Sequence, residues 1–144
     1  METFAEFLFK LIEKKNLTVP EVYRKADLHR KTFSDIRNKK NYLPRRETII
    51  KIIFALELSI DDAQKLLAKA GYTLSDGNEF DLIVAKFIRE KNFNQWELDS
   101  TLAKKNLPCL FFNDWNWLKS YLRSYKTEKI FCYNSAVFEN EVVK

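Results

Sequence analysis

Glycine and proline are scarce in this sequence, which contains only two glycines and three prolines among 144 residues. Sheets and long loops usually need more of these turn residues than helices joined by short connections. The scarcity therefore predicts an all-α protein. The length suits one domain, or one domain with an appendage, and 46% apolar beside 31% charged residues is typical of a globular chain.

Five helices are predicted in the N-terminal half from capping residues and from apolar side chains at helical spacing. Thr3 and Thr18 are expected to cap the first and second helices, and Ser59 the fifth, which should end at Gly71. Asp27 stands where a left-handed residue would turn the chain between the second and third helices. The third and fourth helices are predicted at about 29–37 and 48–56.

A helical hairpin is predicted next, at 78–110, with Asn78 and Asn94 as the caps of its two helices. Both helices have an apolar face that should lean on the first five helices, formed by Phe80, Ile83, Val84, Phe87, Trp96, Leu98 and Leu102. The predicted domains are therefore a bundle at 1–74, this hairpin, and a tail at 111–144.

The C-terminal tail, residues 111–144, is rich in aromatic residues and contains nine of the 21 in the chain. One helical face could be shared by Trp115, Leu118, Tyr121, Leu122 and Tyr125. Beyond Lys126 no clear period remains, so the tail is expected to be only partly helical. It would either dock on the body or mediate association with a partner protein.

Positive charge is concentrated in one region of the sequence. Between Arg24 and Arg46 there are nine Lys or Arg residues against two Asp residues, a local charge of +7, while the whole chain carries +5. Such a region indicates a surface that meets a polyanion, although a well-solvated helix face is an equally open interpretation.

Several functional classes find little support in the sequence. No apolar run approaches the 18 or so residues that a membrane span requires, and the first residues do not read as a signal peptide. Cys109 and Cys132 stand apart without a Cys/His cluster, and His29 is the single histidine. We therefore expect a cytoplasmic protein that is not an enzyme and has no metal or other cofactor.

A succession of residues in the first half has the order and spacing of a known family. It consists of Leu17, Thr18, Ala26, Leu28, Thr32, Phe33, Ser34, Ile36, Pro44, Ile52 and Leu56. Residues 3–70 thus resemble the Xre, or phage-repressor-like, helix-turn-helix family, which is found in bacterial proteins. The resemblance implies a five-helix bundle whose third helix enters the major groove of double-stranded DNA.

Carried over by position, the resemblance implies which side chains would meet DNA. Arg30, Lys31 and Ser34 would project toward the bases. Phosphate contacts would come from the end of the third helix and the following loop, through Asn38, Lys39, Lys40 and Arg45. Asp35 lies on the same helix, where it would repel phosphate or accept a hydrogen bond from a cytosine amino group.

Two functions remain open at this point. One is a sequence-specific transcriptional regulator that binds DNA as a homodimer, because a single module of this size buries little surface. The other is a helix-turn-helix scaffold that binds another protein without specific DNA recognition, through the hairpin or the aromatic tail. Carboxylate partners on Arg30 and Lys31 would favour the scaffold, and free side chains would favour DNA.

Overall fold

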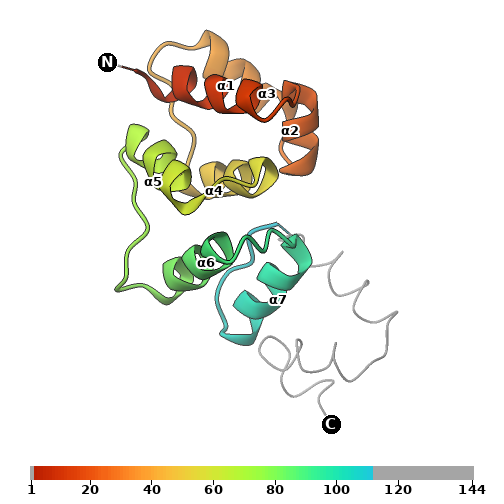
Figure 1. Cartoon of the computed structure of the whole chain (residues 1–144), viewed down its shortest axis with the longest axis vertical. Coiled ribbons are helices and arrows are strands. Elements are labelled where there is room, and N and C mark those ends of the chain that lie inside the picture. Colours follow the sequence, from red (N-terminus) through yellow and green to blue (C-terminus); the bar gives the residue numbers. More distant parts are fainter. Residues whose placement is uncertain (1, 112–144) are drawn as a thin grey trace.

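Seven α-helices make up the part of the chain that the computed structural model describes, residues 2–111. The prediction of an all-α fold is therefore confirmed. Helices α4 and α5 lie between α1–α3 on one side and the α6–α7 pair on the other (Figure 1). The bounds are α1 Phe4–Lys14, α2 Val19–Lys25, α3 Arg30–Asn38, α4 Arg46–Leu56, α5 Ile60–Lys69, α6 Glu79–Arg89 and α7 Gln95–Lys104.

Side-chain caps begin most of these helices, as the sequence predicted. Thr3, Thr18, Ser59, Asn78 and Asn94 each accept a hydrogen bond from the backbone N–H three residues later. Left-handed residues follow several helix ends. They include Asp27 at φ 56° and Gly71 at φ 85°, both at predicted turns. The short connections between helices therefore need very little glycine.

Thr18 and Glu21 form a reciprocal capping box at the start of α2. The Thr18 hydroxyl accepts from the Glu21 N–H at 3.3 Å, and the Thr18 N–H donates to Glu21 Oε1 at 2.8 Å. The bond from the Thr18 backbone lowers the pKa of Glu21. Because this pKa is depressed in the folded state, the contribution of the carboxylate to stability is present at neutral pH and is lost on acidification.

Replacement of Thr18 by alanine is expected to lower the free energy of unfolding by about 1 kcal/mol, because α2 loses its side-chain cap. Urea unfolding followed by circular dichroism measures the change. Thr101→Ala is the matched control, since the Thr101 hydroxyl donates to the Glu97 carbonyl at 2.9 Å in the interior of α7. Alanine is favoured inside helices, so this control should change stability less than Thr18→Ala. Equal effects would mean that the cap contributes little.

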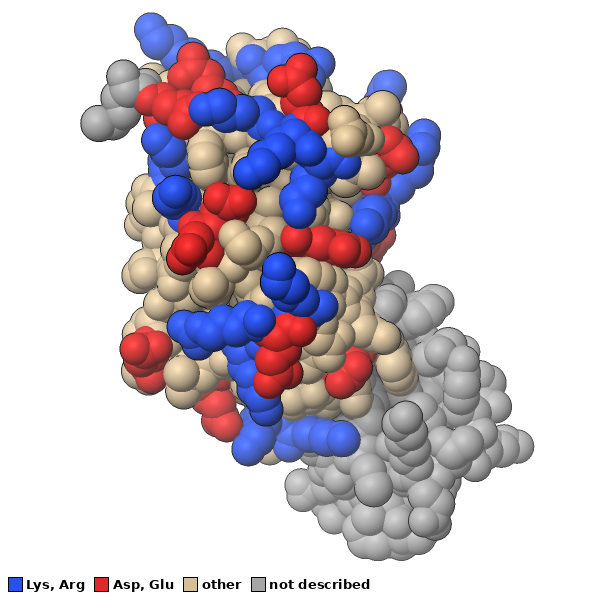
Figure 2. Space-filling view, in the orientation of Figure 1, with Lys and Arg blue, Asp and Glu red and all other residues tan. Residues whose placement is uncertain are grey.

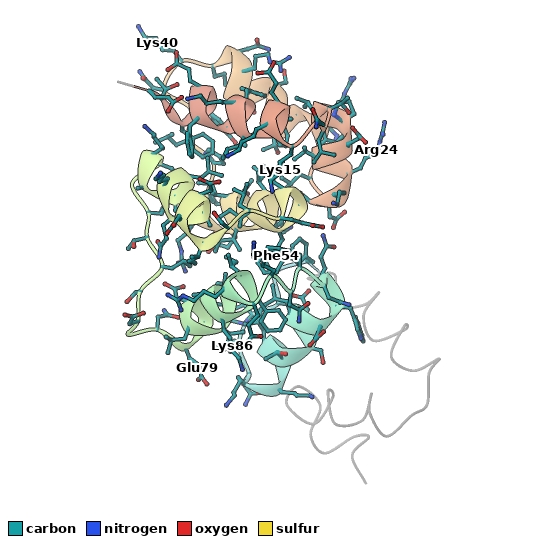
Figure 3. The ribbon with its side chains drawn as sticks, in the orientation of Figure 1. Lys15, Arg24, Lys40, Phe54, Glu79 and Lys86 are labelled. Atoms are coloured by element: carbon teal, nitrogen blue, oxygen red, sulfur yellow. The ribbon has the colours of Figure 1, made fainter. Side chains whose placement is uncertain are left out.

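Helix α4 forms the centre of the hydrophobic core. Seven of its residues are buried on all sides of the helix, namely Ile49, Ile50 and Ile52–Leu56. Apolar residues on more than one side of a helix need cover on more than one side, and α4 packs against both α2 and α5. Phe54 lies on the hairpin side (Figure 3), with its ring 5.5 Å from that of Phe93 and 5.8 Å from that of Phe111.

Arg46 explains why α4 begins two residues earlier than the predicted start at Thr48. Its guanidinium reaches Asp81 Oδ1 of α6 at 2.7 Å and the Thr73 carbonyl at 3.3 Å. Asp81 is buried and also accepts from the Ser75 N–H at 2.8 Å. These long-range partners hold the first turn of α4, and sequence spacing alone could not reveal them. Helix α3 also differs slightly, because it begins and ends one residue later than the predicted 29–37.

The α6–α7 hairpin is attached to the first five helices at one further point, and the segment after α7 is bound to α7 itself. Gln95 Nε2 donates to the Lys25 carbonyl at the end of α2, at 2.6 Å. Buried Asp99 accepts from the N–H groups of Leu110 and Phe111 at 2.7 and 2.9 Å. The two bonds to Asp99 hold the segment after α7 against α7. The predicted helical face at Trp115–Tyr125 and the other predictions for 112–144 lie outside the described residues.

No helix among residues 2–111 is long and apolar enough to cross a membrane.

Candidate nucleic-acid interface

Aromatic packing fixes the orientation of helix α3. Its inner side chains, Phe33 and Ile36, are buried. The Phe33 ring lies 6.5 Å from that of Phe9 on α1 and 6.2 Å from that of Tyr23 on α2. Because these contacts occupy one face of a nine-residue helix, the opposite face is left for polar and charged side chains. In the view of Figure 1, α3 lies behind α1.

An open groove of about 600 Å³ runs between the outer face of α3 and the start of α2; we call it the α3 groove. Arg30, Lys31 and Ser34 all line it, and all three side chains are exposed. The structure therefore brings the three predicted base-contacting residues together on one accessible surface. The remaining lining residues are Val19, Tyr23, His29, Phe33, Arg37 and Asn38.

His29 serves as the cap of α3. Its Nδ1 accepts a hydrogen bond from the Lys31 N–H at 3.1 Å, and its backbone is extended. The single histidine of the chain therefore has a structural role at the helix start. Among residues 2–111, no group of three His, Cys, Asp or Glu side chains could hold a metal ion.

Arg37 also belongs to the α3 groove, although the sequence analysis did not single it out. Its guanidinium stacks on the Phe9 ring at 4.6 Å from the centroid, which limits its orientations. The available signal was its spacing, because Arg37 follows Arg30 by seven positions, which places both on the same side of a helix. The contact with Phe9 comes from α1 and was not visible in the sequence.

The predicted phosphate-contacting residues are divided between two places. Asn38, Lys39 and Lys40 line a second groove of about 690 Å³, which also includes the loop residues 41–43 and the start of α1. Asn38 Nδ2 also donates to Ser34 Oγ at 3.3 Å, and Asn38 borders both grooves. Arg45 is the N-cap residue of α4, where its side chain makes no capping hydrogen bond, and it lines neither groove. Lys40 projects outward at the edge of the molecule (Figure 3).

Carboxylates neutralise part of the basic region. Asp35 lies between Lys31 and Lys39, at 3.7 and 3.5 Å from their Nζ atoms, and Arg46 is paired with Asp81. Among residues 2–111, Arg30 has no ion-pair partner; the same is true of Lys40 and Arg45. On the face drawn in Figure 2, acidic and basic side chains are intermixed.

Comparison with known families gives a match that agrees with this geometry. Residues 8–69 match the family model of the Cro/C1-type HTH DNA-binding domain, a range that runs from within α1 to the end of α5. The comparisons with curated proteins and with solved structures gave no match. The predicted resemblance to phage-repressor-like helix-turn-helix proteins is thus confirmed for the N-terminal half. Residues 8–69 of the chain are therefore similar to Cro/C1-type helix-turn-helix domains, which are of DNA-binding type.

Proposed function

We propose that this protein is a sequence-specific transcriptional regulator that inserts α3 into the major groove of double-stranded DNA. One observation carries the proposal: Arg30, Lys31 and Ser34 line a single open groove on the outer face of α3, within a domain of DNA-binding type. An α-helix fits the width of the major groove, where each base pair presents a distinct pattern of donors and acceptors.

Each of these side chains has donors or acceptors suited to base edges. Arg30 can donate two hydrogen bonds to O6 and N7 of guanine, and Lys31 can reach the same acceptors. The Ser34 hydroxyl can donate or accept, and its bond with Asn38 limits its freedom. Arg30 is the principal base-contacting residue in this proposal, because no carboxylate among residues 2–111 forms an ion pair with its guanidinium.

Phosphate contacts would be made beside the recognition helix. Asn38, Lys39 and Lys40 stand at the end of α3 and in the following turn, and Arg45 precedes α4. Such contacts fix the position of a protein on the duplex without reading its sequence. We propose a homodimer on two half-sites about one helical turn apart, since one small domain buries too little surface for tight specific binding.

We further propose the division of the chain into a DNA-binding unit at 1–74, a hairpin at 78–110 and a tail at 111–144. The hairpin would act as a brace. Its contacts to Lys25 and Arg46 hold the end of α2 and the start of α4, the two elements that flank α3 in the sequence. The tail would be the place for a protein partner.

Two observations favour a second function, that of a protein-binding scaffold. Lys31 is paired with Asp35, and Leu43 in the second groove is 49% exposed. A scaffold would keep the helix-turn-helix for packing and use such surfaces, or the tail, for another protein. Binding to DNA decides between the two functions.

The test is a fluorescence-anisotropy titration of the full chain against the duplex upstream of its own gene and against a scrambled duplex, at about 50 and 200 mM salt. A specific regulator binds the upstream duplex more tightly at both salt concentrations. Equal binding to both duplexes that collapses with salt would reduce the function to a sequence-independent phosphate contact. No binding at either salt concentration would leave the scaffold as the function.

Arg30→Ala is expected to lower the preference for the upstream duplex by roughly 1–3 kcal/mol, because a bidentate contact to guanine is lost. The same titration measures it as a ratio of the two dissociation constants. Lys40→Ala is the contrasting variant. It is expected to weaken binding to both duplexes alike and to reduce the slope of log affinity against log salt by about one. If Arg30→Ala behaved like Lys40→Ala, Arg30 would be a phosphate contact and not a base reader.

A further inference from the structure

We propose that Asp35 limits the affinity of this protein for DNA of arbitrary sequence, by holding Lys31 and Lys39 and by repelling phosphate. Asp35 is thus a specificity-determining residue whose role is to oppose binding. The inference rests on the proposed function of α3. It adds to the surface of α3 a residue that weakens DNA binding, beside the residues that would contact bases.

The geometry places Asp35 at the centre of an ionic triad on α3, formed by Lys31, Asp35 and Lys39. The two lysines stand one helical turn before and after it, with Nζ–Oδ distances of 3.7 and 3.5 Å. Their side chains are 68% and 59% exposed, whereas that of Asp35 is 17% exposed. The lysines therefore extend past the carboxylate toward solvent, and the carboxylate lies below them.

The position of Asp35 in the helix argues against a mainly structural role. Acidic residues stabilise the first turn of a helix, but the first turn of α3 contains none, and Asp35 is its sixth residue. The lysine ends of both ion pairs are largely exposed, and pairs of this kind between neighbouring turns contribute little to stability and are screened by salt. The buried contacts of α3 come from Phe33 and Ile36 instead.

The consequence for DNA follows from charge. Lys31 borders the α3 groove and Lys39 borders the second groove, so the triad joins the two surfaces that would face the duplex. A phosphate that binds either lysine must displace Asp35 and then tolerate its negative charge nearby. At a site with a suitably placed cytosine, the exposed amino group can donate to the carboxylate, and the penalty is compensated. Other sequences provide no such compensation.

Asp35→Asn tests the proposal, because it removes the charge and keeps the size and shape of the side chain. Binding of the full chain to the scrambled duplex is expected to tighten about three- to tenfold at 50 mM salt. The slope of log affinity against log salt is expected to steepen by about one to two, as released lysines reach phosphates. Affinity for the upstream duplex should rise less or fall, so the preference between the two duplexes decreases.

Asp27→Asn is the matched control, since Asp27 is an exposed carboxylate in the preceding turn and asparagine tolerates its left-handed backbone. It makes the same change in net charge without touching the triad. An equal gain from Asp27→Asn would overturn the proposal, because net charge alone would then explain the effect. Unchanged scrambled-duplex affinity and slope in Asp35→Asn would overturn it as well.

The outcomes also separate this proposal from the proposed function. If the wild type prefers the upstream duplex and Asp35→Asn leaves scrambled binding unchanged, sequence-specific regulation stands and the role of Asp35 fails. If the wild type shows no preference but Asp35→Asn tightens binding with a steeper slope, the role of Asp35 in limiting phosphate binding stands and specific regulation fails. If neither protein binds either duplex at 50 mM salt, both fail.

Discussion

Replacement of Phe54 by alanine is expected to lower the free energy of unfolding by about 3–5 kcal/mol, the largest effect predicted for a single residue here. Phe54 is 2% exposed and lies in the last turn of α4. Its ring contacts those of Phe93 and Phe111, so the substitution opens a cavity between α4 and the hairpin. Urea or thermal unfolding followed by circular dichroism measures the loss.

Leu82→Ala provides the control for this substitution, because Leu82 is 44% exposed on α6 and should change stability by no more than about 0.5 kcal/mol. A double-mutant cycle of Phe54→Ala with Phe93→Ala should give a coupling energy of roughly 0.5–3 kcal/mol, as expected for rings in contact. Additive effects in that cycle would contradict the packing of the hairpin on α4.

Asp99→Ala is expected to cost about 2–4 kcal/mol of stability. Asp99 is fully buried, and its two carboxylate oxygens accept from the N–H groups of Leu110 and Phe111. Alanine would leave these two buried donors without their acceptor, and each such group costs roughly 1–3 kcal/mol. Denaturant unfolding gives the total change, and amide hydrogen exchange locates it.

Amide hydrogen exchange shows whether the loss of stability in Asp99→Ala comes from the segment that Asp99 binds. Protection of the Leu110 and Phe111 amides should fall in Asp99→Ala relative to the wild type, because their acceptor is removed. Asp76→Ala changes an exposed carboxylate in the connection between α5 and α6, and should alter stability by no more than about 0.5 kcal/mol. Unchanged protection of Leu110 and Phe111 would show that Asp99 does not hold this segment.

Local chemistry made much of the fold predictable. Helix starts could be predicted from N-cap residues, because a cap and its partner N–H are only three residues apart. These caps are Thr3, Thr18, Ser59, Asn78 and Asn94. The left-handed turn at Asp27 was predictable for a similar reason, since short polar side chains tolerate that conformation. The order and spacing of apolar and polar residues between Leu17 and Leu56 then indicated a resemblance to the helix-turn-helix family, which the match over residues 8–69 supports.

Part of the membership of the candidate site was predictable, but the ion pairing of its side chains was not. Arg30, Lys31 and Ser34 were named from the family resemblance, and in the structure they line one groove. The pairing of Lys31 with Asp35 depends on side-chain conformation, which spacing permits without requiring it. Arg37 was missed because its orientation comes from Phe9, a residue of another helix.

By itself, the sequence determined the helices, their caps and the family of the N-terminal half, because these depend on neighbours within a few residues. Tertiary structure alone decided which charged side chains remain free of partners within the protein and which are bound inside it. Arg46 counts in the sequence as part of the basic region, yet it is bound to Asp81, 35 residues away. Asp99 likewise reads as a surface charge on α7 and is in fact buried against Leu110 and Phe111. The physical reason is that burial brings together groups distant in the chain, and a buried charge must find partners there.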